Sequence, residues 1–199
     1  MKLRSVGLEG AWLVGMNRHE DTRGWFGRLH CDREFAALGL PERFVQSNIS
    51  HNRRSGTVRG LHWQWPPSQE GKLIRCIRGR IFDAFVDLRP DSPTFTQHAS
   101  VELDADSADS VFIPAGFAHG FQVLADDTEV LYLMSDFYAP ELSAGFRFDD
   151  PAFAVRWPAA ITDMSERDAQ APTFQRSAFV TEYRSRLASP QGGPGRERI

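Results

Sequence analysis

Short alternating runs of apolar and polar residues, separated by Gly, Pro and Asp, fill the middle of this 199-residue chain. Successive side chains of a strand point to opposite faces, so such runs are typical of strands with one buried face. The runs cover residues 72–77, 81–88, 98–103, 111–113, 121–124 and 129–134. This spacing predicts a β-sandwich or a jelly-roll barrel, and the lack of strand–helix alternation argues against a parallel α/β sheet.

One short segment, Asp32 to Leu38, has a clear helical pattern, with Asp32 as its candidate cap. The chain has the length of one domain. We expect a single all-β domain over residues 1–183, with a barrel core at about 21–158 and a small C-terminal appendage at 159–183. Residues 184–199 are polar and rich in Gly and Pro, which predicts a flexible tail.

The charge balance excludes one broad class of partner. Lys and Arg number 23 against 26 Asp and Glu, so no nucleic-acid-binding surface is indicated. No apolar run reaches the length of a membrane span, and residues 1–14 lack the apolar stretch of a secretory signal. The two cysteines, Cys31 and Cys76, suit a reducing compartment. We therefore expect a cytoplasmic protein without a membrane partner.

The six histidines give little support to a metal site. No pair has HxH or HxxxH spacing, and a three-histidine site of His51, His62 and His119 remains an alternative that the spacing does not favour. Gly71-Lys72 lacks the upstream glycines and the Ser or Thr of a phosphate-binding loop. The sequence thus predicts neither a bound metal nor a nucleoside triphosphate site.

The run VRGLHWQ, residues 58–64, offers a candidate cavity wall. In a regular strand Arg59, Leu61 and Trp63 share one face, and His62 lies on the other beside Gly60 and Gln64. A histidine between a small and a polar neighbour suits a cavity. The alternative, which this segment taken alone slightly favours, is a hydrogen-bonded structural histidine.

Eight segments occur in the order of a known family. They are DTRGWF (21–26), FVQSNIS (44–50), VRGLHWQ (58–64), GKLIRCIRGRIFDAFVDLR (71–89), SPTF (92–95), IPAGFAHGF (113–121), DFYAPE (136–141) and SERD (165–168). With them the chain resembles the dTDP-4-dehydrorhamnose 3,5-epimerases, isomerases of deoxysugar and polysaccharide biosynthesis. The resemblance covers about three quarters of the chain, from Asp21 to Asp168.

The resemblance implies a cupin-type jelly roll that works without a metal or other cofactor. It also implies a homodimer with exchanged N-terminal strands and a nucleotide-sugar substrate. The implied reaction is epimerisation at C3, C5 or both of a nucleotide-linked 4-keto-6-deoxyhexose, by proton removal and return through an enolate.

The motifs also imply a role for each site residue. His62 matches the general base, Asp168 the carboxylate that orients it, Tyr132 the proton donor, and Lys72 the cation near the C4 oxygen. The implied substrate-binding residues are Arg23, Arg28, Gln46, Asn48, Arg59, His119 and Tyr138.

Two positions depart from the family pattern. Arg28 stands where the family usually has a glutamate, and Ser143 stands where it often has an acid. Both belong to the implied substrate contacts, so the sequence does not fix which nucleotide carries the sugar. The alternatives are a C3-only or C5-only epimerase on another nucleotide sugar, a 3,4-ketoisomerase, a non-catalytic sugar-nucleotide-binding cupin and, last, a metal-dependent oxygenase.

Overall fold

The structure is a computed structural model that describes residues 1–41 and 43–188. Its helices are α1 (Asp32–Ala37), α2 (Glu166–Ala169) and α3 (Arg176–Ala188). Its strands are β1 (Lys2–Ser5), β2 (Trp12–Gly15), β3 (Arg18–Asp21), β4 (Gly24–Gly27), β5 (Gln46–Asn52), β6 (Thr57–Gln64), β7 (Lys72–Arg78), β8 (Arg80–Asp87), β9 (His98–Asp104), β10 (Ser110–Ile113), β11 (Phe117–Val123), β12 (Thr128–Met134), β13 (Ser143–Gly145) and β14 (Asp163–Met164).

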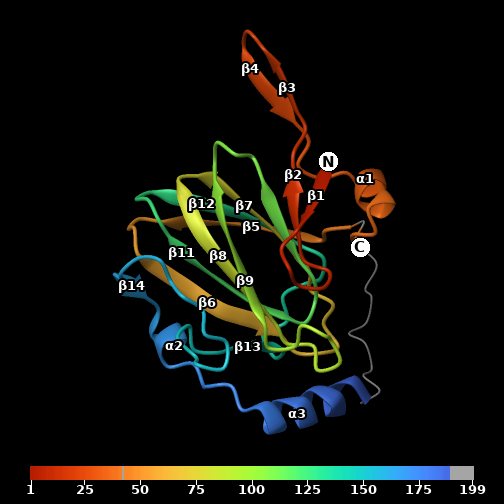
Figure 1. Cartoon of the computed structure of the whole chain (residues 1–199), viewed down its shortest axis with the longest axis vertical. Helices are drawn as coiled ribbons and strands as arrows, with labels where there is room; N and C mark the ends of the chain where they lie inside the picture. The colour runs from red at the N-terminus through yellow and green to blue at the C-terminus, as the bar shows by residue number, and fades with distance from the viewer. Residues whose placement is uncertain (42, 189–199) are drawn as a thin grey trace.

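Two sheets form the body of the molecule (Figure 1). The first sheet has the order β1-β2-β10-β7-β12-β5, and the second has the order β13-β6-β11-β8-β9. Pairing within both is antiparallel, and among the described strands only the short β14 pairs in parallel, with β6. Neighbours in space are mostly distant in sequence, as in a jelly roll. The expected all-β sandwich of the cupin type is confirmed.

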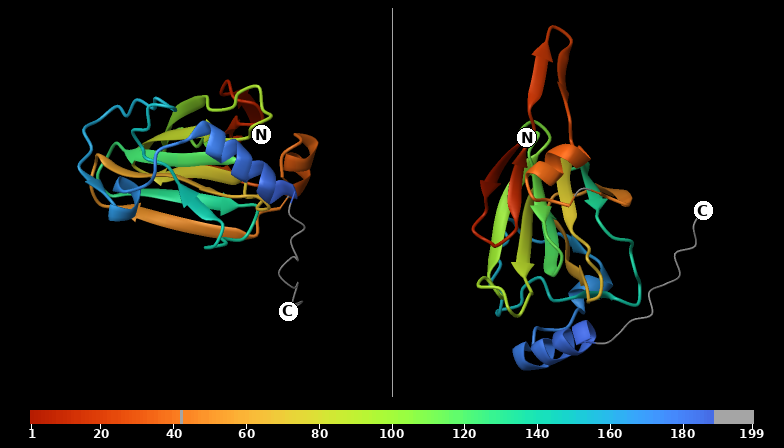
Figure 2. Two further views of the ribbon diagram at one scale, coloured as in Figure 1. Left: turned by 90° about the horizontal axis from the view of Figure 1, so that it is seen from below. Right: turned by 90° about the vertical axis from the view of Figure 1, so that its right-hand side faces the viewer.

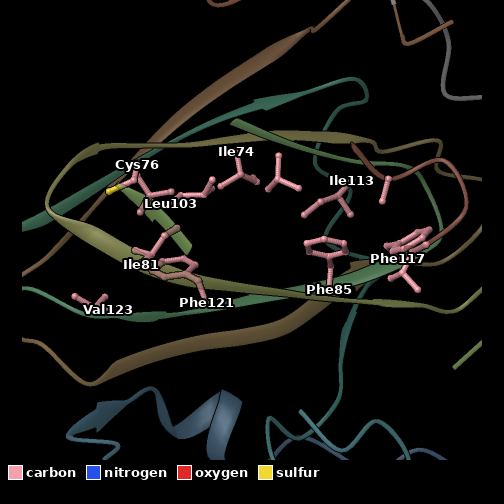
Figure 3. Packing of buried hydrophobic residues seen from close by; sticks show 13 residues of the cluster. Ile74, Cys76, Ile81, Phe85, Leu103, Ile113, Phe117, Phe121 and Val123 are labelled. Carbon is pink, nitrogen blue, oxygen red and sulfur yellow. The ribbon is translucent and has the colours of Figure 1, made fainter. Parts of the chain in front are cut away.

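A core of apolar side chains fills the space between the sheets (Figure 3). Alternation along β7 points Ile74 and Cys76 inward, and alternation along β8 points Ile81 and Phe85 toward them. The same alternation places Lys72 on the inward face of β7. The same face of β7 that packs in the core therefore also directs a polar side chain, Lys72, into the interior.

Most predicted strands are confirmed, with two differences. β11 begins at Phe117, four residues before the predicted start, because the segment expected to be a turn already pairs with β8. β1 and β2 complete the first sheet through β10, so the sheets begin well before residue 21. Helix α1 occurs where predicted, but its N-cap is Cys31, which makes no side-chain capping bond.

Helix α3 packs on the outside of the second sheet (Figure 2). Its Phe179 and Tyr183 join Trp63, Phe146 and other rings in a second buried cluster, which we call the aromatic layer. Burial of these large rings is what fixes the helix to the sheet. The predicted tail boundary at residue 184 falls inside α3, and residues 189–199 of that segment lie outside the described residues.

A hairpin of β3 and β4 projects from the body (Figures 1 and 2). It carries Trp25 and Phe26, whose exposed fractions are 47% and 72%. We call this hairpin the arm. Within the described part of the chain, no helix is long and apolar enough to cross a membrane.

Candidate active site

A cavity of about 320 Å³ opens between the two sheets. Both sheets contribute to its walls: β6 and β11 from the second sheet, and β5, β7 and β12 from the first. Its polar and aromatic lining includes Asn48, Ser50, Arg59, His62, Gln64, Glu70, Lys72, His119, Tyr132, Tyr138, Ser143 and Arg167. Mixed apolar and polar walls of this kind suit a small organic ligand with charged groups.

A β-bulge in β6 brings Arg59 and His62 to the same wall. His62 pairs with His119 and Arg59 pairs with Phe121, so two residues of β6 oppose Gly120 alone. The strands approach closely here: a Cβ on Gly60 would lie 2.5 Å from the Gly120 Cα. The predicted separation of Arg59 and His62 onto opposite faces was therefore wrong, because the extra residue reverses the alternation.

His62 forms a hydrogen-bonded pair with Asp168. Its Nε2 lies 2.6 Å from Asp168 Oδ1, and the Gly60 amide donates to Oδ2 at 3.2 Å. Asp168 sits in α2, where its own amide donates to the Ser165 cap. Burial alone would raise the pKa of Asp168, but the hydrogen bonds and charge of His62 and the Gly60 amide hold it below its usual value. An ionised carboxylate that accepts the Nε2 proton leaves Nδ1 of His62 free to act as a base.

Tyr132 stands on the first sheet, across the cavity from His62. Its hydroxyl lies 3.0 Å from Ser50 Oγ, which also accepts from Asn52. Burial raises the pKa of the Tyr132 phenol far above its usual value, although the Ser50 bond opposes this. The phenol is thus protonated at neutral pH and can donate a proton.

His119 belongs to a second His–Asp pair, deeper in the sandwich. Its Nε2 lies 2.8 Å from Asp83 Oδ2, and Asp83 has no exposed surface. No described residue donates to the other oxygen of Asp83. Burial raises the pKa of Asp83, and the neighbouring His119 charge opposes that rise.

The structure brings together most of the predicted residues, but not all. His62, Lys72, Tyr132, Asn48, Arg59, His119 and Tyr138 line the cavity, and Asp168 lies against His62. Gln46 lies next to it, where its side chain accepts from the Tyr138 amide at 3.1 Å. Arg23 lies on the arm and pairs with Asp21, and Arg28 follows β4 and pairs with Glu34. Neither arginine lines this chain's own cavity.

Five polar residues at or beside the cavity were not predicted as site residues. Glu70 contacts the predicted Lys72, and Ser50 contacts the predicted Tyr132. Gln64 donates to Glu70, and Asp83 holds His119. Arg167 donates at 3.0 Å to Ser143, one of the two positions singled out above as departing from the expected family pattern. Asp83 was detectable, because a charged residue on the inward face between Ile81 and Phe85 breaks an apolar pattern.

The alternative of a three-histidine site is not supported by the geometry. His62 and His119 are register neighbours, but His51 lies beside Asp127 and Glu129 instead. Across residues 1–41 and 43–188, no group of three or more His, Cys, Asp or Glu side chains is arranged to hold a metal ion.

Comparison with known proteins gives consistent matches over most of the chain. The family model of dTDP-4-dehydrorhamnose 3,5-epimerase matches residues 5–176. An enzyme of that name from Sinorhizobium fredii is 37% identical over 184 residues, which is 92% of this chain and 94% of the relative. A dTDP-4-dehydrorhamnose 3-epimerase from Streptomyces niveus is 38% identical over 172 residues, 86% of this chain and 83% of the relative.

A solved structure extends the match to three dimensions. The dTDP-4-dehydrorhamnose 3,5-epimerase of Bacillus anthracis, crystallised with TDP and PPi, superposes with a TM-score of 0.84 at 35% identity. The superposition covers 87% of this chain and 99% of that one. Sequence match and fold agree, and the chain belongs to the dTDP-4-dehydrorhamnose 3,5-epimerase family.

Proposed function

We propose that this protein epimerises C3 and C5 of dTDP-linked 4-keto-6-deoxyglucose. The observation that carries the proposal is the placement of a base and an acid on opposite walls of one cavity. His62 comes from β6 in the second sheet, and Tyr132 comes from β12 in the first. Inversion at carbon requires removal of a proton from one face of the ring and delivery to the other, which this placement supports.

Each step has a group suited to it. His62, oriented by Asp168, takes the proton next to the C4 ketone, and the negative charge moves to the C4 oxygen. Lys72, an inward cation on the cavity wall, stabilises that enolate. Tyr132, protonated at neutral pH, returns a proton to the opposite face. The sequence of steps conserves atoms and electrons and needs no oxidant.

The substrate contacts follow from charge and shape. Arg59 is held by Asn52 at 2.7 Å and lines the cavity, where a guanidinium suits the diphosphate. Asn48, His119 and Arg167 add donors along the same cavity. Tyr138, half exposed at the cavity, is placed to stack on the base.

The reaction is tested by hydrogen exchange with solvent. The protein is incubated in D₂O with 4-keto-6-deoxy sugars linked to dTDP, CDP or GDP, and deuterium is located by NMR. Entry of deuterium at both C3 and C5 of the dTDP-linked sugar is the expected result. The absence of exchange with all three nucleotides would overturn the proposal and favour a binding protein.

The number of carbons inverted separates two candidates. The relatives include both a 3,5-epimerase and a 3-epimerase at nearly equal identity. Deuterium at C3 alone would place this protein with the Streptomyces relative. Movement of the keto group to C3 would show a 3,4-ketoisomerase instead.

We also propose a homodimer in which the N-terminal strands are exchanged. The arm carries Arg23 and the exposed Trp25 and Phe26, and Arg28 directly follows β4. Neither arginine lines this chain's own cavity. A second copy would cover the exposed rings and bring both arginines to a binding site. Light scattering should give twice the chain mass, and a Trp25→Ser, Phe26→Ser variant should shift toward the monomer. A wild-type monomer would refute this.

The cytoplasm is the location that we propose. Cys31 and Cys76 are both free thiols, which suits a reducing compartment. Fractionation of the native host should recover the protein with cytoplasmic markers, and recovery outside the cell would refute this.

A further inference from the structure

One buried carboxylate in the cavity has no part in the proposed reaction. Glu70 lies just before β7 and is 7% exposed, and Lys72, two residues on, is 8% exposed. Glu70 Oε1 accepts from the Lys72 ammonium. Both line the same cavity as His62 and Tyr132. A buried ammonium needs a counter-charge, and among the described residues Glu70 is the acid that contacts it.

The second carboxylate oxygen of Glu70 contacts a residue of the other sheet. Gln64 of β6 donates to Oε2 at 2.9 Å. The same side chain donates to the Phe137 carbonyl at 3.3 Å and accepts from the Ala139 amide at 2.7 Å. Tyr138 lies between those two backbone contacts. Glu70 therefore connects Lys72 on one sheet with Gln64 on the other and, through Gln64, with the segment that carries Tyr138.

We propose that Glu70 is a positioning residue that holds Lys72 and the Tyr138 segment in their working places. The inference rests on the proposed function. An ammonium has three donors, and one bond to Glu70 leaves two for the developing enolate oxygen. Because the bond to Glu70 exists before substrate arrives, the ammonium need not be reoriented when charge develops.

The two contacts can be separated by substitution. In Glu70→Gln the amide oxygen still accepts from Gln64, but the charge on Lys72 is unpaired. This variant should lower kcat for exchange about 10- to 100-fold and change KM less than about 3-fold, because enolate stabilisation is a transition-state interaction. In Glu70→Ala both contacts are lost, so KM for the dTDP-linked sugar should also rise. Glu141→Gln makes the same chemical change at an exposed site and should leave both constants unchanged.

A double-mutant test distinguishes positioning from a general loss of structure. If Glu70 acts through Lys72, adding Glu70→Gln to Lys72→Met should change the exchange rate less than about 2-fold. Additive losses, or a Glu70→Gln enzyme with wild-type kcat, would overturn the inference. Failure of the proposed function would show differently, as absence of exchange in the wild-type protein itself. Thermal unfolding of each variant shows that the comparison is made on folded protein.

Discussion

The two His–Asp pairs share a plan but differ in their surroundings. His62 and His119 are register neighbours on β6 and β11, and each places Nε2 against a carboxylate, at 2.6 and 2.8 Å. The His62 side chain is 46% exposed, and its partner comes from the separate helix α2. The His119 side chain is 6% exposed, and its partner Asp83 lies in the neighbouring strand β8 of the same sheet.

The carboxylates respond to these surroundings in opposite directions. The pKa of Asp168 lies below its usual value, since its hydrogen bonds and the His62 charge outweigh burial. The pKa of Asp83 lies above its usual value, since burial outweighs the single bond to His119. A histidine beside a firmly ionised carboxylate, open to the cavity, is suited to accept a proton. The deeper pair is suited to hold a donor in place.

Replacement of the two histidines should separate the pairs most strongly. His62→Asn should slow deuterium exchange about 1,000-fold, because the general base is lost. His119→Asn should slow it only about 10-fold, because a hydrogen bond to substrate is lost. NMR of deuterium incorporation measures both. Equal losses would erase the distinction between the pairs.

The carboxylates provide the next largest contrast. Asp168→Asn should lower kcat about 300-fold, because an amide can force the wrong tautomer on His62. Asp83→Asn should lower it about 10-fold, since His119 is held but does not carry the proton. Steady-state kinetics on both variants check this order. A larger loss in Asp83→Asn would reverse the assignment of base and donor.

Tyr132 tests whether the wall opposite His62 supplies the acid. Tyr132→Phe keeps the ring contacts with His119 and Phe121 but removes the hydroxyl. Inversion should fall about 100-fold, while deuterium still enters at one carbon. Product configuration is read by NMR, with Tyr183→Phe in the aromatic layer as the matched control. Normal inversion by Tyr132→Phe would show that the acid is elsewhere.

The smallest effect concerns stability against pH. A carboxyl group with a lowered pKa stabilises the fold at neutral pH, and this contribution is lost as pH falls through the folded-state value. Asp168→Asn should therefore lower the free energy of unfolding by about 1 kcal/mol at pH 7. The difference in stability between this variant and the wild type should shrink below about pH 4.

Asp83 should show the reverse slope. A raised pKa means that the folded protein gains stability as Asp83 becomes protonated. The stability that Asp83→Asn loses relative to the wild type should therefore grow as pH falls from 7 toward 4. Urea unfolding between pH 3.5 and 7 measures both slopes, using about 0.5-unit steps to follow the single-proton linkage. Parallel slopes would contradict the opposite pKa shifts.

Local pattern was enough to predict most strands, and the family motifs supplied the candidate site residues. Alternation located β7, β8 and β9, because each turns alternate side chains toward the core between the sheets. The motifs pointed to His62, Lys72 and Tyr132, and all three line one cavity.

What escaped prediction depends on contacts between distant segments. The grouping of Arg59 with His62 depends on how β6 pairs with β11, which no local pattern records. Helix α3 is held by rings of the aromatic layer that come from other elements. The proposed role of Glu70 depends on its contact with Gln64, which lies on the opposite sheet.

Because of the bulge opposite Gly120, the site depends on the close approach of two backbones as well as on its reactive side chains. The half of β6 that precedes the bulge pairs with β14, which leads directly into the helix that carries Asp168. A side chain at Gly60 or Gly120 would collide with the facing backbone and press the two strands apart. Such a chain would retain every acid, base and cation while losing their arrangement. A genome survey that scores only the reactive side chains would count it as a working epimerase, so the two glycines belong in the search pattern.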